Sequence, residues 1–142
     1  MQASTFDPVG QGYTQMAHKE GYIAMSGPYY WKREGDTTIY GFQSDERHGN
    51  PNGVLHGAAL LTFVDTFIGH AVVSATARKC ATIGINAQFV AGTPAGCWVT
   101  GHARLRKVTR SLAFVDAETV GNDMLLLTAS AIFRVFETSQ SQ

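Results

Sequence analysis

The chain has 142 residues, of which 44% are hydrophobic and 15% are charged, and its formal net charge at pH 7 is zero. This length and composition predict one globular domain, residues 1–142, with a single hydrophobic core. Proteins that bind nucleic acid or anionic membranes carry a surplus of basic residues, so neither is expected as a partner here. Any site that binds an anion must therefore depend on a local group of donors and not on the net charge of the chain.

The first residues, MQASTFDPVGQGY, contain neither a basic start nor an apolar run, so we expect no secretory signal. Cys80 and Cys97 are too few and too far apart for a disulfide framework or a zinc site. A cytoplasmic protein with reduced thiols is therefore expected. The five histidines show no metal-ligand spacing, and no H-E-x-x-H motif is present, so no metal is predicted.

The N-terminal region is predicted to form a short helical leader within residues 1–25. Asp7 and Pro8 suit the N-cap and the first position of a helix, and apolar side chains at 9, 13, 16 and 17 share one face before Gly21 stops it. Aromatic and β-branched residues over 22–31 and 37–43 then predict two strands, joined by a polar turn at 32–36.

The stretch from Asn50 to Arg78, NPNGVLHGAALLTFVDTFIGHAVVSATAR, predicts a long helix that is apolar nearly all round and therefore buried. Residues 54–77 are also long enough to span a membrane. However, an Asp alone would cost about 3 kcal/mol at the bilayer centre, and polar residues interrupt the stretch at His56, Thr62, Asp65, Thr66, His70 and Ser74. A core helix is the better interpretation, and no membrane partner is expected.

Asp65 is the only formally charged side chain between Arg47 and Arg78. An ionised carboxylate is costly to bury without a partner, so Asp65 must be hydrogen-bonded, neutralised by a raised pKa, or placed where a ligand enters. A structural acid bonded to Thr62, Thr66 or a partner chain is the alternative to a catalytic one.

The start of this helix is a candidate site for an oxygen atom that carries negative charge. His56 and Gly57 fall in its first turn, where backbone N–H groups lack intrahelical partners and the helix dipole is positive. Gly57 has no Cβ, so another molecule can approach these donors closely. An anion or a polarised carbonyl oxygen could bind there.

Beyond Arg78 the pattern alternates with a period of two, as in strands with one core face. A tight hairpin is predicted at residues 121–123, and residues 138–142 form a polar tail. The residues expected to face inward are Ile83, Ile85, Ala87, Phe89, Val99, Ala103, Leu105, Ala113, Val115, Ala117, Leu125, Leu127, Ala129, Ala131, Phe133 and Val135. The predicted fold class is α+β, with one long helix wrapped by an antiparallel sheet of about six strands.

Asn50, His56-Gly57 and Asp65 together resemble the N-x5-HG-x7-D pattern of the hotdog-fold acyl-CoA thioesterases. The similarity is greatest to the branch that includes the phenylacetate-pathway enzymes and thioesterase superfamily member 2. It extends over residues 29–137, where TIGINAQFV and RLRKVTRSLAFVDAETVGNDMLLLTASAIFRVF resemble strands of that family.

The resemblance implies a hotdog fold and hydrolysis of an acyl-CoA thioester, with no cofactor beyond this substrate. Asp65 would be the nucleophile or general base, and the Gly57 N–H would polarise the thioester carbonyl. Asn50 and His56 would orient the site, and Thr82 falls where the branch has a hydroxyl residue near the attacking water. The resemblance also implies a homodimer whose sheets join edge to edge, often paired into a homotetramer.

Geometry gives an independent reason for a dimer. Gly57 and Asp65 lie eight residues apart, which is about 12 Å along a helix. An oxyanion donor and a base must each lie about 3 Å from the reacting atoms. Two antiparallel helices from two chains would place Gly57 of one opposite Asp65 of the other, giving two equivalent sites.

Several of the candidate site residues could instead have a purely structural role. Asn50 competes with Asn52 as the motif residue, and either suits an ordinary turn; Thr82 is common in any strand. Aromatic side chains at 29, 30, 31 and 42 could line an acyl pocket or simply fill the core. The sequence favours neither an aryl nor an aliphatic acyl group, and a non-catalytic acyl-CoA-binding protein of the same fold is the alternative function.

One basic cluster could contact the phosphates of CoA, since Arg pairs well with phosphate oxygens. The alternative is that its members pair with Asp116 or Glu118 across a hairpin. The cluster consists of Arg104, Arg106, Lys107 and Arg110.

Overall fold

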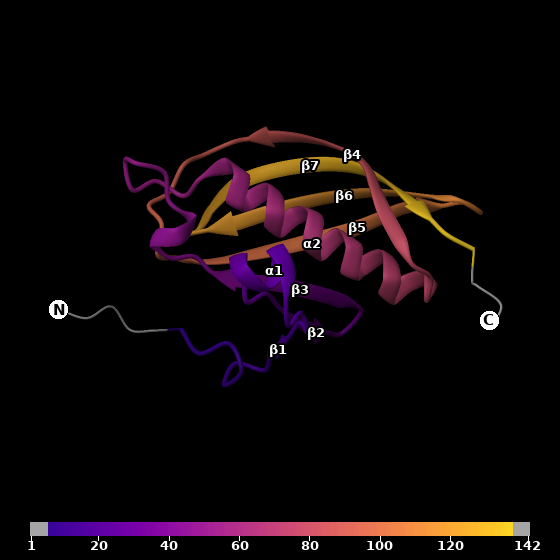
Figure 1. Ribbon diagram of the computed structural model, residues 1–142, viewed down its shortest axis with the longest axis horizontal. Helices are drawn as coiled ribbons and strands as arrows, with labels where there is room; N and C mark the ends of the chain where they lie inside the picture. The colour runs from indigo at the N-terminus through magenta and orange to yellow at the C-terminus, as the bar shows by residue number, and fades with distance from the viewer. Residues whose placement is uncertain (1–5, 138–142) are drawn as a thin grey trace.

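The computed structural model describes residues 6–137 and consists of a seven-stranded antiparallel sheet that curves around one long helix (Figure 1). The strand order is β1-β2-β3-β5-β6-β7-β4. The predicted α+β hotdog class is confirmed; the seventh strand is the two-residue β1. In chain order the elements are β1 Thr14–Gln15, α1 Gly21–Ser26, β2 Tyr30–Glu34, β3 Thr37–Gln43, the 3₁₀ helix η1 Glu46–His48, α2 Gly57–Thr76, β4 Cys80–Phe89, β5 Trp98–Val108, β6 Leu112–Gly121 and β7 Met124–Val135.

The core is built from one stripe of α2 and the inner face of the sheet. At i, i+3, i+4 spacing, the α2 residues that are fully buried are Leu60, Phe63, Val64, Phe67, Ile68 and Val72. Opposite them, alternate residues of β5, β6 and β7 point inward, as predicted for residues such as Val99, Val115 and Phe133. The β6–β7 hairpin turns at Asn122 and Asp123, both with positive φ, as a type I′ turn requires.

α2 approaches the sheet closely because small residues lie beneath it. A Cβ built on Gly101 of β5 would fall 2.3 Å from Cε2 of Phe67, whose side chain is fully buried. Ala117, Ala129 and Ala131 provide further small inward side chains on β6 and β7. The aromatic rings of α2 therefore fill the space that larger strand residues would occupy.

The opposite side of α2 is open to solvent, which differs from the sequence expectation of a helix covered on most sides. Ala58 and Val73 are exposed, and Thr62, Asp65 and Gly69 are half-buried. The helix is long and apolar enough to cross a membrane by length and composition alone, with a mean hydropathy of 1.6. In the structure its apolar stripe packs on the sheet, as in the core helix of a soluble protein.

A bulge in β4 changes which residues face the helix. Thr82 pairs with Phe133 and Gly84 pairs with Ile132, so Ile83 is the extra residue. Thr82 therefore faces the helix, as Ile85 does. The two residues are three positions apart, a spacing that would place them on opposite faces of a regular strand. The prediction that Ile83 faces the core is wrong, and its side chain is 58% exposed. β4 is an edge strand, because β7 is its only partner among the described strands (Figure 1).

The predicted leader helix from Asp7 to Gly21 is wrong. Asp7 caps only a short turn by accepting the Gly10 N–H at 3.1 Å, and Gly12 then adopts φ +93°, which ends helical geometry. The helix of this region is α1, which begins at Gly21, the predicted helix stop, and continues to Ser26 through the first half of the strand predicted at 22–31. β2 also extends further than expected, because Lys32 lies in the strand and not in a turn.

The phase of β7 changes near its start. A register shift opposite Thr119 and Val120 brings Leu126 as well as Leu127 into the core, while Leu125 is 37% exposed. The prediction that Leu125 faces inward is therefore wrong, and the inward positions from Leu127 onward are confirmed. The polar tail predicted at 138–142 lies outside the described residues.

The close approach of α2 to β5 makes Gly101 a sensitive position. Gly101→Ala places a methyl group within the volume of the Phe67 ring and is expected to lower the free energy of unfolding by about 1–3 kcal/mol in urea denaturation. Gly92→Ala is the matched control, because its Cβ would meet only Val54 Cγ1 at an ordinary 3.6 Å. Equal stability of the two variants would contradict the tight packing described here.

Candidate active site

Asp65 points from α2 toward β4, where Thr82 meets it. The Thr82 hydroxyl donates to Asp65 Oδ1 at 2.5 Å. The β4 bulge makes this possible, because it turns Thr82 to the helix side of the sheet. Thr62 and Thr66 donate instead to helix carbonyl groups at Ala58 and Thr62, so neither bonds to Asp65. The second carboxylate oxygen of Asp65 has no hydrogen-bond partner among the described residues and can accept a proton.

Cys80 lies close to this carboxylate but is not activated as a nucleophile. Burial raises the pKa of the Cys80 thiol, and the negative charge of Asp65 raises it further. Its Sγ donates to the Gly69 carbonyl oxygen at 3.7 Å. The thiol is therefore held protonated, which leaves the Asp65 carboxylate as the candidate reactive group at this position.

The N-terminus of α2 presents a free backbone donor. His56 is the N-cap, and its Nδ1 accepts the Ala58 N–H at 2.9 Å. The Ala59 and Leu60 N–H groups bond to the His56 carbonyl oxygen. The Gly57 N–H has no acceptor among residues 6–137 and points out of the positive end of the helix dipole. The structure thus places His56 and Gly57 at the start of α2, the position expected from the sequence.

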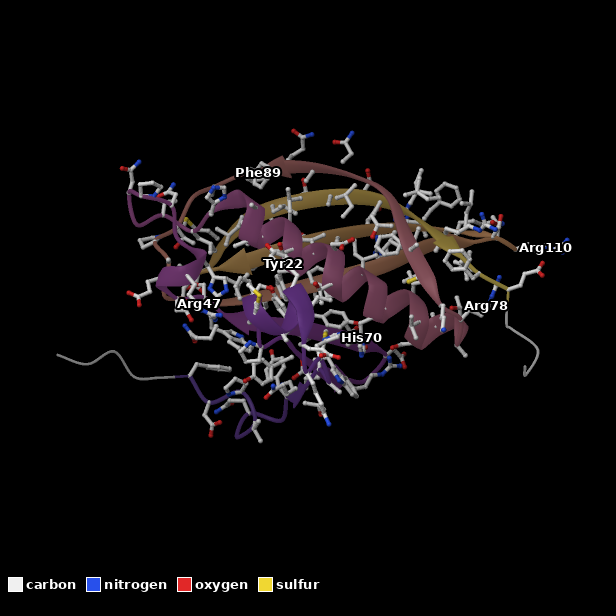
Figure 2. The ribbon with its side chains drawn as sticks, in the orientation of Figure 1. Tyr22, Arg47, His70, Arg78, Phe89 and Arg110 are labelled. Carbon is white, nitrogen blue, oxygen red and sulfur yellow. The ribbon has the colours of Figure 1, made fainter. Side chains whose placement is uncertain are left out.

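Phe89, the last residue of β4, is a site residue that sequence reasoning assigned to the core. Its side chain is 55% exposed, and the ring lies against Gly57, where an added Cβ would fall 2.8 Å from Phe89 Cε1. Figure 2 shows Phe89 beside the start of α2. The absence of a side chain at Gly57 therefore leaves room for this ring against the first residue of α2.

Asn50 holds the loop that leads into α2. Its Oδ1 accepts the Asn52 N–H at 2.8 Å and the Val54 N–H at 3.1 Å, which makes it the turn-forming member of the two asparagines. His48 and His56 are joined across the same loop by a backbone hydrogen bond of 2.7 Å. Asn50 thus fixes the approach to the helix N-terminus through its loop.

The predicted basic cluster lies away from the helix side of the sheet. Arg106, at a bulge in β5, pairs with Asp116 at 3.6 Å, and Arg110 pairs with Glu137 at 2.8 Å. Arg104 and Lys107 have no ion-pair partner among the described side chains. The structure therefore does not bring these four residues to Asp65. Arg78 joins them at this end of the molecule, where it donates to the Arg110 carbonyl oxygen at 2.7 Å (Figure 2).

His70 is bonded to and packed against aromatic residues of the core. The Tyr40 hydroxyl bonds to its Nδ1 at 2.9 Å, and its ring packs between Trp31 and Tyr40. Burial lowers the pKa of His70, and nearby His18 lowers it further. Ser74 Oγ lies 3.4 Å from the same nitrogen. In a catalytic triad the serine and the orienting group bond to opposite nitrogens of the histidine ring, so Ser74 and His70 do not form such a triad.

The described residues therefore contain two separated groups that are candidates for the two halves of a catalytic site. A carboxylate held by a threonine hydroxyl can act as a base, and a free N–H at a helix N-terminus can stabilise an oxyanion. Eight residues of α2, about 12 Å, separate them within one chain. Within residues 6–137, no group of three or more His, Cys, Asp or Glu side chains is placed to hold a metal ion.

Comparison with known proteins points to one family. The sequence profile described as the thioesterase superfamily matches residues 52–127, which include His56, Gly57, Asp65 and Thr82. The candidate esterase PA0474 of Pseudomonas aeruginosa is 24% identical over 130 residues, covering 89% of this chain and 97% of that protein.

Solved structures share the fold. A mutant thioesterase PA1618 of Pseudomonas aeruginosa superposes with a TM-score of 0.72 at 23% identity, covering 80% of this chain and 84% of that one. The PaaI protein of the E. coli phenylacetic acid degradation operon gives 0.72 at 15% identity, covering 81% and 84%. A hypothetical thioesterase of Streptococcus pneumoniae, solved with coenzyme A, gives 0.68 at 16% identity, covering 75% and 87%.

The capping role of His56 can be measured separately from any chemical role. His56→Ala leaves the Ala58 N–H without its acceptor and is expected to lower the free energy of unfolding by about 1 kcal/mol. His56→Asn, which supplies a side-chain oxygen to the same N–H, should retain most of the stability. Chemical denaturation at one fixed protein concentration compares the three proteins, and an Ala variant as stable as the Asn variant would rule out the cap.

Proposed function

This chain belongs to the thioesterase superfamily and is a thioester hydrolase, and on that premise we propose that it hydrolyses an acyl-CoA thioester to a free acid and CoA. We assign Asp65 as the general base and the Gly57 N–H of a second protomer as the oxyanion donor. The observation that carries this assignment is the Asp65 carboxylate bonded to Thr82, in the same helix that begins with a free N–H group.

In the proposed reaction, Asp65 accepts a proton from a water molecule while the oxygen of that water attacks the thioester carbonyl carbon. The Thr82 hydroxyl already donates to Asp65, and its lone pairs can accept a hydrogen bond from the same water. Negative charge develops on the carbonyl oxygen, where the Gly57 N–H and the helix dipole stabilise it. The C–S bond then breaks, and the thiolate of CoA leaves and takes up a proton.

Two unpaired surfaces support a homodimer that completes each site. The open side of α2 carries small residues, including Ala58 and Gly69, so a second helix can approach it closely. The free edge of β4 adjoins this side, because Thr82 of β4 bonds to Asp65 of α2. An exposed ten-residue edge strand is a template for pairing with another strand. An antiparallel second copy would cover both surfaces and bring Gly57 opposite Asp65 of its partner.

The CoA portion of the substrate is supported by the S. pneumoniae thioesterase, whose structure contains coenzyme A. In this chain we assign its phosphates to the basic end of the molecule, where Arg104 and Lys107 have no carboxylate partner among the described residues. Arg106 and Arg110 already have partners in Asp116 and Glu137. Exposed guanidinium and ammonium groups suit phosphate oxygens.

Replacing the proposed base should abolish turnover without unfolding the protein. Asp65→Asn keeps the shape and can still bond to Thr82, but it cannot accept a proton at pH 7. We expect turnover, measured as free CoA release over a panel of thioesters, to fall by at least about a hundredfold. Unchanged circular dichroism serves as the folding control. Turnover near that of the wild type would remove Asp65 from the mechanism.

The shared site can be tested with a proline that removes one N–H group. Position 57 is the first residue of α2, where proline is well tolerated, and His56 has the extended backbone (φ −70°, ψ 136°) that precedes proline. Gly57→Pro should lower kcat by about 10²–10³-fold. Gly57→Ala, which keeps the N–H and adds the same Cβ contact with Phe89, is the matched control and should retain more activity.

Mixing Gly57→Pro with Asp65→Asn then tests whether the two groups come from different chains. After unfolding and refolding together, half of the dimers are mixed, and each mixed dimer has one intact site. About a quarter of the wild-type activity should return. No recovery, with mixed dimers demonstrated by mass spectrometry, would place both groups in one chain.

A further inference from the structure

A pocket of about 390 Å³ lies between α1, η1 and the first two turns of α2, within the size range of ligand sites. We call it the α1 pocket. Tyr22 and Met25 of α1 form its outer wall, and both are largely exposed, at 65% and 71%. Figure 2 shows Tyr22 on α1, in front of α2, and Arg47 near the N-terminal end of α2. Its remaining lining residues are Ser26, Tyr29, Arg47, His48, Gly49, His56, Ala58, Ala59 and Thr62.

The wall formed by α1 is fixed mainly by hydrogen bonds from η1. α1 has six residues, none of them fully buried. The Arg47 guanidinium donates to the carbonyl oxygens of Met25 and, at 2.8 Å, Gly27. His48, which is 5% exposed, accepts the Asp45 N–H at Nδ1 and therefore donates from Nε2 to the Ser26 carbonyl oxygen at 2.6 Å. Three consecutive carbonyl groups are thus held by two adjacent side chains.

With the exception of His56 Nε2, the side-chain polar groups around the α1 pocket are already bonded to other protein groups. The Tyr29 hydroxyl donates to Ser26 Oγ at 2.9 Å, and Ser26 Oγ donates to the Tyr22 carbonyl oxygen at 2.9 Å. The Tyr22 hydroxyl meets Thr62 Oγ1 at 3.3 Å. Arg47 is neutralised by Asp45 at 3.0 Å. What remains for a ligand is a surface of tyrosine rings, a thioether and alanine methyl groups.

The α1 pocket opens beside the proposed oxyanion donor. His56 and Ala58, the sequence neighbours of Gly57, both line it. A thioester carbonyl oxygen bonded to the Gly57 N–H therefore lies at its mouth. Phe89 lies against Gly57 from β4, outside the set of residues that line the pocket. The pocket is the cavity that the acyl side of the substrate can enter from this position.

Given the proposed thioesterase function, we propose that the α1 pocket binds the acyl group, and that α1, fixed by Arg47 and His48, sets its size limit. The pocket selects an uncharged, apolar acyl group, either a single aromatic ring or a medium-length aliphatic chain. A carboxylate at the far end of the acyl group would lose its hydration without gaining an unpaired cation, because Arg47 is already paired with Asp45. Met25 and Ala59 are the specificity-determining positions.

Filling the pocket should reject larger acyl groups selectively. Ala59→Leu is compared with Ala75→Leu, the same change on the same helix at a residue that lines a different cavity. Acetyl-, hexanoyl-, phenylacetyl- and glutaryl-CoA are the probes. For Ala59→Leu we expect kcat/KM for the hexanoyl and phenylacetyl thioesters to fall at least about tenfold, with acetyl-CoA within about threefold of wild type. A size-selective loss in Ala75→Leu instead would overturn the proposal.

Enlarging the pocket gives a second test that does not disturb the core. Met25→Ala shortens an exposed wall residue and should raise kcat/KM for acyl chains longer than hexanoyl by about tenfold relative to acetyl. Met124→Ala, on β7, is the control. An unchanged acyl preference in Met25→Ala and Ala59→Leu, or wild-type enzyme that prefers glutaryl-CoA, would refute the acyl pocket. If one of these results is found and Asp65→Asn nevertheless abolishes turnover, the acyl pocket is refuted while the proposed hydrolysis is still supported.

Discussion

The packing of α2 against the inner face of the sheet is the constraint on which the structure depends. A twenty-residue apolar helix needs a cover, and the curved sheet covers one side of it through glycine and alanine positions that let Phe63 and Phe67 sit close to the strands. This arrangement fixes the height of α2 above β4 and so the distance from Asp65 to Thr82. The same arrangement leaves the opposite side of the helix, with its half-buried carboxylate, without cover from its own chain.

Hydrophobic periodicity predicted the elements whose residues alternate between the core and the surface. The long helix, β3 at residues 37–43 and the alternation along β5 and β6 were predictable because burial dictates every second or every third and fourth residue. The N-terminal region was not, because backbone conformation decides it. Gly12 breaks the leader with a positive φ, and α1 depends on distant donors in η1 that local sequence cannot reveal.

The candidate site was predictable at motif positions and less so where tertiary contacts matter. Asp65 stood out as a lone acid in an apolar helix, and His56 and Gly57 mark the helix start. Whether Thr82 would face Asp65 depended on a bulge, and the alternation of β4 predicted the opposite phase. Phe89 follows an apolar pattern and was assigned to the core. Its glycine contact, 32 residues away in sequence, follows only from the fold.

The extra residue in β4 makes the length of this strand part of the chemistry. With ten residues and no bulge, β4 would send Thr82 and Ile85 to opposite faces, because they are three positions apart; the extra residue Ile83 returns them to the same face. If the bulge were lost without a change in length, every side chain could be retained while the hydroxyl turned away from the carboxylate. A related chain that lacks the bulge would keep a hydroxyl on the helix side only if an even number of positions separated it from the next inward residue of the strand.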